Sequence, residues 1–421
     1  MVNLTRFPLQ FPEKRPFFLE SSGIFAMGEP GEVELFYSRR VGLADDGTPI
    51  PLDAGARLHG RSGSYRAGVL AVRTGGDEDA TDLVARVTRD VLSRGRVGAM
   101  VTSQYLPDET GRWSAGLDLQ LPFLVGGQNL VASGYGATSH EGTGSSEAWG
   151  LFVDYPNDWS DSYLGVSRVG EGFDPALGFV REDGIQRYTG GFQFFPRPRG
   201  LGVRRLNLKP IAWEVANDLD GERAYAAYEI RPLGVEFESG AEVELNLQRF
   251  VDAPGERFEI FPGSVIRPGS YTYDRIEARF LSSAGRRWTL DLTGSAGEFY
   301  DGTATELEAS VELRSAPHLI TFVDYSVQSV RRPQSDFTTQ VARVGVDLAA
   351  SPRFGGSVLT QWENESNRLS VNARVHWTPQ PGSDVYLAWS SAWPTALEGG
   401  IPWRRPHSGV LIGKLVHYFR M

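Results

Sequence analysis

Charged residues at every second position are the clearest candidates for chemistry in this sequence. Side chains two residues apart on a β-strand lie on one face, so each set would present its charges together. The residues are Arg275, Glu277, Arg279, Glu306, Glu308 and Glu312. Charge pairing across neighbouring strands, worth up to about 1 kcal/mol per pair, is the simpler interpretation. The alternative is an electrostatic field that orients a polar solute, and the two interpretations are compatible.

Motifs for metal binding or covalent catalysis are absent. The 6 histidines are scattered, with no two at the spacing of metal ligands. The acidic stretch 217–222 fails as a calcium loop, because Gly221 at the invariant glycine position puts Ala216 and Ala227 at the first and last ligand positions. We therefore predict a hairpin turn there, and no metal, cofactor or catalytic residue. A hydrolase site assembled from Ser, His and Asp on separate strands stays open as a less favoured alternative.

Alternating apolar and polar residues show which elements must position these charges. In the stretch 368–377, Leu369, Val371 and Val375 share one parity, while the other parity is polar throughout. This is the period of a strand with one apolar and one polar face. Soluble strands usually have about 5–6 residues, whereas a strand that crosses a bilayer obliquely needs about 9–11. Strands of this length recur along most of the chain.

The strand pattern predicts an all-β fold: a single closed antiparallel transmembrane β-barrel. We expect about 20 strands, within roughly 18–22 because strand boundaries are uncertain. The apolar rows would face lipid and the polar rows a lumen. Aromatic residues near strand ends, such as Trp159, Trp377 and Trp389, and a last strand that ends near Phe419 agree with this. A soluble sandwich or propeller would instead pack the apolar rows against one another.

Residues 1–52 differ from the strands that follow. The stretch 7–20 contains three prolines and paired aromatics, and proline lacks the amide donor that a central strand needs. We expect an extended segment over 1–52 and the barrel over 53–421. The segment is either a plug whose charges pair with the lumen or a periplasmic linker to an upstream domain. Its candidate residues are Glu13, Lys14, Arg15, Glu20, Arg39 and Arg40.

Composition excludes several classes of protein. The chain has 421 residues and a net charge of −10, which argues against nucleic-acid binding because that requires a basic surface. It has no cysteine, so disulfide scaffolds and thiolate metal sites are excluded. There is no apolar run of about 18 residues that could form a spanning helix. No export signal is visible at the start, and we expect an upstream part to be missing.

Four stretches of the first hundred residues resemble a known family. They are 2–20, 35–40, 55–60 and 82–90. They resemble an uncharacterised family of bacterial outer-membrane β-barrels that usually follows a carbohydrate-binding module of the family-nine type, and the likeness extends over nearly the whole chain. The resemblance implies an outer-membrane location, contact with outer-membrane lipid, a missing upstream carbohydrate-binding domain and a glycan-related role. It implies no catalytic residue.

These observations lead to one principal hypothesis of function. We expect an outer-membrane β-barrel that allows the passage or surface binding of a polar solute, for which a saccharide is a candidate, without covalent chemistry. The first rival is a surface-binding or scaffold barrel with a filled lumen. The second is a barrel-embedded hydrolase, which would need catalytic groups that converge at one rim.

Overall fold

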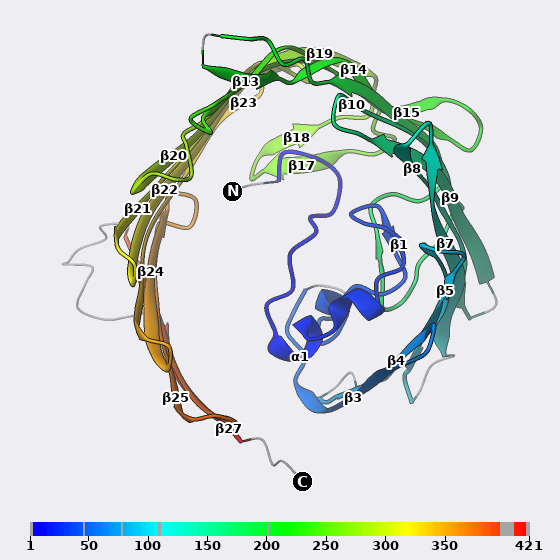
Figure 1. Cartoon of the computed structure of the whole chain (residues 1–421), viewed down its shortest axis with the longest axis vertical. Helices are drawn as coiled ribbons and strands as arrows, with labels where there is room; N and C mark the ends of the chain where they lie inside the picture. Colours follow the sequence, from blue (N-terminus) through cyan, green and yellow to red (C-terminus); the bar gives the residue numbers. More distant parts are fainter. Residues whose placement is uncertain are drawn as a thin grey trace.

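One large antiparallel sheet curls around an N-terminal segment (Figure 1). The computed structural model of the chain describes residues 3–44, 47–76, 79–107, 111–142, 144–200, 202–395 and 408–417. Phe419, which the sequence placed at the end of the last strand, lies outside these residues. Within the described ranges, no helix combines the length and the apolar character that membrane crossing requires.

The large sheet contains 22 named strands in the described part of the chain. They are β3 (Leu52–Ser62), β4 (Tyr65–Thr74), β5 (Thr81–Val91), β6 (Gly95–Tyr105), β7 (Arg112–Val125), β8 (Gln128–Glu141), β9 (Gly144–Pro156), β10 (Ser160–Val169), β12 (Ile185–Phe194), β13 (Val203–Leu206), β14 (Leu208–Asp218), β15 (Arg223–Phe237), β16 (Glu242–Asp252), β19 (Tyr271–Leu281), β20 (Trp288–Phe299), β21 (Gly302–Ala316), β22 (Leu319–Arg332), β23 (Ser335–Ser351), β24 (Phe354–Glu363), β25 (Arg368–Gln380), β26 (Ser383–Pro394) and β27 (Ser408–His417). Apart from the 4-residue β13, each has 10 to 17 residues, as the alternation predicted.

Smaller elements lie in the N-terminal segment and in two of the connections. The segment contains α1 (Pro16–Leu19), η1 (Ser22–Ile24), β1 (Gly28–Glu29), β2 (Val33–Glu34) and η2 (Ser38–Arg40). β11 (Phe179–Val180), from the connection after β10, pairs with β2. The connection after β16 forms a hairpin of β17 (Phe258–Phe261) and β18 (Ser264–Ile266), and Figure 1 shows this hairpin inside the curled sheet.

The sheet does not form the closed circle that the sequence led us to expect. Leaving out β13, 21 strands follow one another through 20 antiparallel ladders. No ladder joins β27 to β3 among the described residues, and Figure 1 shows the two apart. After an even number of antiparallel steps β3 and β27 run in the same direction. Direct pairing between them would therefore be parallel, unlike those 20 ladders.

The two faces of the sheet have opposite character. Apolar rows point away from the lumen and are exposed; Leu117 on β7 is 66% exposed and Leu411 on β27 is 67% exposed. The rows of the other parity carry polar residues such as Arg86 and Asp118, which pair across strands at the inner face. This arrangement excludes a sandwich or propeller in which the apolar rows pack on one another.

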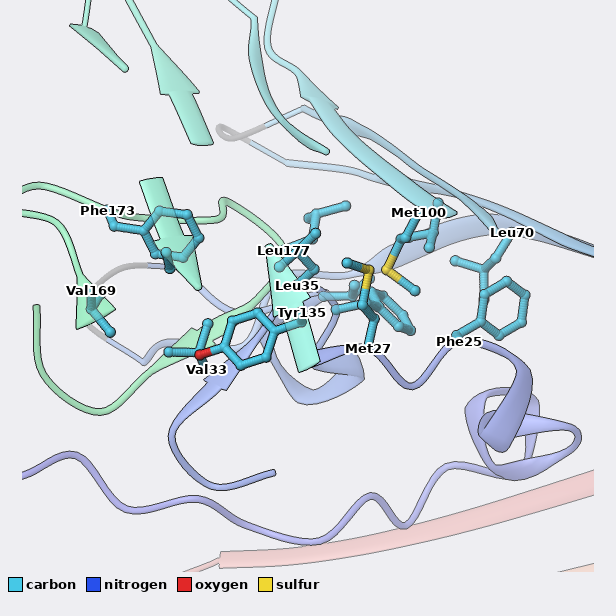
Figure 2. Close-up of a cluster of buried hydrophobic side chains, with 14 of the residues drawn as sticks. Phe25, Met27, Val33, Leu35, Leu70, Met100, Tyr135, Val169, Phe173 and Leu177 are labelled. Carbon is cyan, nitrogen blue, oxygen red and sulfur yellow. The ribbon is translucent and has the colours of Figure 1, made fainter. Parts of the chain in front are cut away.

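Two hydrophobic clusters lie inside the curled sheet rather than between sheets. The larger joins the N-terminal segment to the wall of β4–β10, and Figure 2 shows Phe25, Met27 and Leu35 beside Leu70 and Met100. The smaller gathers around the β17–β18 hairpin, and Leu4 reaches it from the start of the segment. The segment therefore connects two parts of the inner wall.

Candidate functional site

The N-terminal segment packs on the inner wall through apolar side chains. Met27 and Leu35 lie in one buried cluster with Leu70, Val84 and Met100 of the wall. These three wall residues lie on the inward rows of β4, β5 and β6, and Val84 and Met100 are the apolar residues on rows that otherwise hold polar residues or glycine. Apolar residues on a lumen row are the sequence signal that could have revealed the docking surface.

Glycines in the wall allow the segment to approach closely. A Cβ added at Gly116 on β7 would lie 2.3 Å from Met27 Cε and 2.9 Å from the carbonyl oxygen of Gly136. A Cβ added at Gly68 on β4 would lie 2.8 Å from Phe25 Cζ. Such distances leave no room for a larger side chain, so the wall is shaped to accept this segment.

Buried ion pairs also hold the segment to the wall. Arg187 of β12 has a side chain that is 5% exposed, and it contacts the carboxylates of Glu29 and, at 2.6 Å, Glu32. Burial raises the pKa of Glu29, and the nearby Arg187 only partly opposes this. A buried charge is tolerated only with a partner of opposite sign, and Arg187 is the partner that Glu29 contacts.

A second ion cluster fixes the beginning of the segment. Arg6 contacts Glu182 in the connection after β11 and donates to Asp252 of β16 at 3.1 Å. Burial disfavours the charge of Arg6, but the two carboxylates outweigh it and raise the pKa of the guanidinium. Asp252 also accepts a hydrogen bond of 2.6 Å from the Tyr300 hydroxyl. The sequence did not single out any of these residues.

Two of the predicted charges of the segment pair with each other, and a third contacts the wall. Glu13 and Arg15 pair with each other at 2.8 Å, whereas the plug alternative had paired both with lumen charges. Lys14 is exposed, and Arg39 and Arg40 lie in η2. Glu20 contacts the wall at Arg57 of β3.

Acidification is expected to loosen the segment through Glu13. Burial alone would raise its pKa, but hydrogen bonds from Arg15, Ser38 and Lys14 lower it from 4.5 to about 2. A carboxylate with a lowered pKa stabilises the folded state above its unfolded pKa, and that contribution is lost as the pH falls from 4.5 toward 2. Limited proteolysis of the segment should therefore accelerate in this range. In Glu13→Gln the rate should be higher at neutral pH and should lose most of this dependence; an unchanged acid profile would contradict the role of Glu13.

The wall opposite the segment carries the charged rows that the sequence highlighted. Arg275 donates to Glu306 at 2.7 Å, Glu277 accepts from Asn246 at 2.8 Å, and Arg279 pairs with Asp291 at 2.7 Å. Arg275–Glu306 and Arg279–Asp291 are charge pairs between strands, as in the simpler interpretation, whereas the partner of Glu277 is a neutral amide. Two of the three also line a cavity of about 490 Å³. Its other charged lining residues are Asp291, Glu308, Asp324 and Arg343.

The inward hairpin adds a further feature that the sequence did not predict. Arg332 at the end of β22 is buried, pairs with Asp301 at 2.6 Å and donates to the Ser264 hydroxyl at 3.1 Å. Phe261 stacks on Phe337 with ring centroids 4.4 Å apart. The hairpin is therefore anchored to the wall and narrows the lumen beside Leu4.

The acidic stretch after β14 forms the predicted hairpin turn. Asp218 Oδ1 accepts hydrogen bonds from the backbone N–H groups of Asp220 at 3.1 Å and Glu222 at 2.8 Å, so this oxygen is engaged within the turn. Within the described ranges, no three His, Asp or Glu side chains are grouped as a metal site requires.

Comparison with known proteins bears on the fold and on the first residues. The family model of a domain of unknown function (DUF5916) matches residues 1–54. The match therefore covers the N-terminal segment. The resemblance had led us to expect a match over nearly the whole chain. No curated protein matches the chain.

Among solved structures, the chain is similar to a mutant of the ferric enterobactin receptor from Pseudomonas aeruginosa. The TM-score is 0.52 at 9% sequence identity, over 84% of this chain and 72% of that chain. At this identity the likeness shows the fold alone, which is the large antiparallel sheet of an outer-membrane receptor barrel.

Proposed function

We propose that the chain is a bacterial outer-membrane β-barrel protein that binds a polar solute in its lumen and lets it pass, with the N-terminal segment as a plug. The observation that carries this proposal is the polarity of the two faces of the sheet, which is the reverse of that in a soluble protein. Apolar rows are exposed on the outer face, while the inner face holds charges and the docked segment. The similarity to a receptor barrel supports the same proposal.

The outer face suits a hydrocarbon environment. Contiguous exposed apolar surface of this extent is rare on soluble monomers and marks contact with membrane or protein. Exposed tryptophans accompany it at strand ends, among them Trp159, Trp288 and Trp377. Aromatic girdles of this kind lie at the two interfaces of membrane barrels, so outer-membrane lipid is the partner that we propose for this face.

The inner face suits a polar solute. The cavity at Arg279 and Asp324 offers carboxylates, guanidinium groups and hydroxyls, which can replace the hydration of a sugar or another polar molecule. A saccharide remains the solute class that the family resemblance favours. The same resemblance favours a carbohydrate-binding domain as a partner of this barrel.

A barrel that only binds at the surface, with its lumen permanently filled, is the second candidate. The observation that favours it is the double anchoring of the segment, by Arg187 at one cluster and by Arg6 at the other. A plug that moves must break the contacts of both Arg187 and Arg6. A segment that fills the lumen permanently keeps both sets of contacts.

Closure of the sheet is part of the proposal. The ring would close either through a parallel ladder between β3 and β27 or through one added strand that runs antiparallel to both. Either arrangement removes the two unpaired edges, which lipid cannot solvate.

Gel migration and planar-bilayer recording test the proposal together. The purified chain in detergent should migrate differently before and after boiling in SDS, since a closed barrel resists unfolding by SDS until it is heated. Reconstituted protein should insert and show discrete conductance steps, at least after residues 1–40 are removed. If the full chain and the chain without residues 1–40 both insert but neither conducts, only the surface-binding function is left. Failure to insert would overturn the membrane location.

A further inference from the structure

A second cavity, separate from the charged wall described above, lies between the N-terminal segment and β4–β9. It has a volume of about 610 Å³, within the range of roughly 300–1,000 Å³ typical of small-molecule sites. Ser21 and Ile24 line it from the segment, and Arg66, Arg86 and Arg96 line it from the wall.

Arg86 on β5 is the central residue of this cavity. Its side chain is 3% exposed, and its Nη2 donates to Asp118 Oδ2 at 2.7 Å. Its Nε and Nη1 have no hydrogen-bond partner among the described residues. Buried polar groups are nearly always paired, and a guanidinium keeps its donors and its charge at any physiological pH. Two free donors on a buried arginine therefore indicate that a ligand completes the site.

Charge in this region favours an anion. Three arginines share the single carboxylate of Asp90: Arg61 and Arg66 lie 3.2 Å from it, and Arg96 lies 3.9 Å away. Arg86 with Asp118 adds one further pair. Among the residues that line the cavity itself, three arginines face one carboxylate, Asp118, in a chain whose net charge is −10. The local excess of positive charge is the reverse of the whole molecule.

The acceptor side of the cavity points to a ligand that also carries hydroxyls. Asp118 Oδ1 is buried without a hydrogen-bond partner in the described part of the chain, and so is the Tyr135 hydroxyl. A simple oxyanion would satisfy Arg86 but would face the free oxygen of Asp118. A hydroxyl group on the same molecule can donate to that oxygen, while the anionic group accepts from Arg86.

We propose that this cavity binds a small hydroxyl-bearing oxyanion, either a carboxylate or a phosphate, through Arg86 and Asp118. The ligand bridges the wall and the N-terminal segment. The proposal concerns binding and does not depend on passage through the barrel, so it stands or falls separately from the pore function.

Equilibrium binding to the full chain in detergent tests this inference. The probes are galacturonate, which carries hydroxyls and a carboxylate; galactose 6-phosphate, which carries hydroxyls and a phosphate; and the matched neutral sugar galactose. One of the two charged probes should bind at least tenfold more tightly than galactose, and the tighter one identifies the anionic group. Equal affinity for all three, or no binding of either charged probe, would overturn the proposal.

Variants locate the site within the chain. Arg86→Gln should weaken binding of the preferred probe at least tenfold. Because this variant leaves Asp118 without its cation and can misfold, the double variant Arg86→Gln with Asp118→Asn replaces both charges by groups that can still hydrogen-bond to each other. Arg249→Gln breaks an exposed ion pair with Asp274, lines neither cavity, and is the matched control that should bind like the parent. If the folded double variant binds the probe as tightly as the parent does, the binding site does not lie in this cavity.

Discussion

Replacing Gly116 with leucine is expected to displace the N-terminal segment and to raise the conductance of reconstituted protein several-fold. A Cβ at this position already falls 2.3 Å from Met27 Cε and 3.0 Å from Leu35 Cδ2. The rest of a leucine side chain extends further into the same buried cluster. Overpacking of a filled core costs typically about 1–3 kcal/mol, and here the element that can yield is the segment, because the wall strands are held by ladders on both sides.

Planar-bilayer recording measures this effect directly, with Gly136→Leu as the control. Gly136 is on the neighbouring strand β8 and has no atom within 4 Å of an added Cβ, so the same substitution there should leave conductance unchanged. Deletion of residues 1–40 should raise the conductance at least as much as Gly116→Leu does. If Gly116→Leu exposes the segment to protease but the conductance of both variants stays at the level of the parent, the segment is not what limits passage.

The strands and their orientation could be predicted because they follow from local sequence. The two-residue period of stretches such as 368–377 fixes which side chains share a face, and turn chemistry separates consecutive strands, as at Asp218. The outward exposure of the apolar rows followed from strand length. Each of these features depends on residues that are close in the chain.

The docking of the segment could not be predicted in the same way because its partners are remote. Arg6 finds Glu182 and Asp252 at sequence separations of 176 and 246 residues. Glu13 and Arg15, which the sequence suggested for this role, pair with each other instead, since closing a loop of two residues costs little entropy. The docking surface did leave one kind of local signal in the sequence. It is an apolar residue in a polar row, such as Val84.

The absence of a ladder between β3 and β27 was missed for a different reason. Whether β3 and β27 can pair as antiparallel neighbours depends on whether the number of strands between them is odd or even. An estimate of about 20 strands that is uncertain by two leaves that parity undetermined. Only the ladders themselves, from β3 to β27, show that the two edges run in the same direction.

Replacing Arg187 with glutamine is expected to weaken docking of the segment by about 3–5 kcal/mol, the typical cost of removing one partner of a buried ion pair. Arg187 is the cation in contact with Glu29, whereas Glu32 is also 2.8 Å from Arg181. In the variant Glu29 must be buried as an unpaired carboxylate, take up a proton or leave the wall. The cleavage rate within the segment by trypsin, which can act after Lys14, measures the outcome.

The pH dependence separates loss of this ion pair from general misfolding. Burial already raises the pKa of Glu29 in the parent, and loss of Arg187 removes the charge that opposes this shift. A carboxyl group with a higher pKa in the docked state than in the free state binds its proton more tightly when docked. Docking of the variant should therefore recover as the pH falls toward the raised pKa and weaken as the pH rises above it. The parent should show much less recovery in the same range.

Two further variants make the test specific. Adding Glu29→Gln to Arg187→Gln removes the unpaired charge, so it should restore much of the protease resistance at neutral pH and abolish the acid rescue; such non-additivity is the signature of a direct interaction. Arg249→Gln breaks an exposed pair with Asp274 and should change little, because solvent screens exposed pairs. If the double variant is as protease-sensitive as Arg187→Gln at every pH, then Arg187 holds the segment through packing rather than through the charge of Glu29.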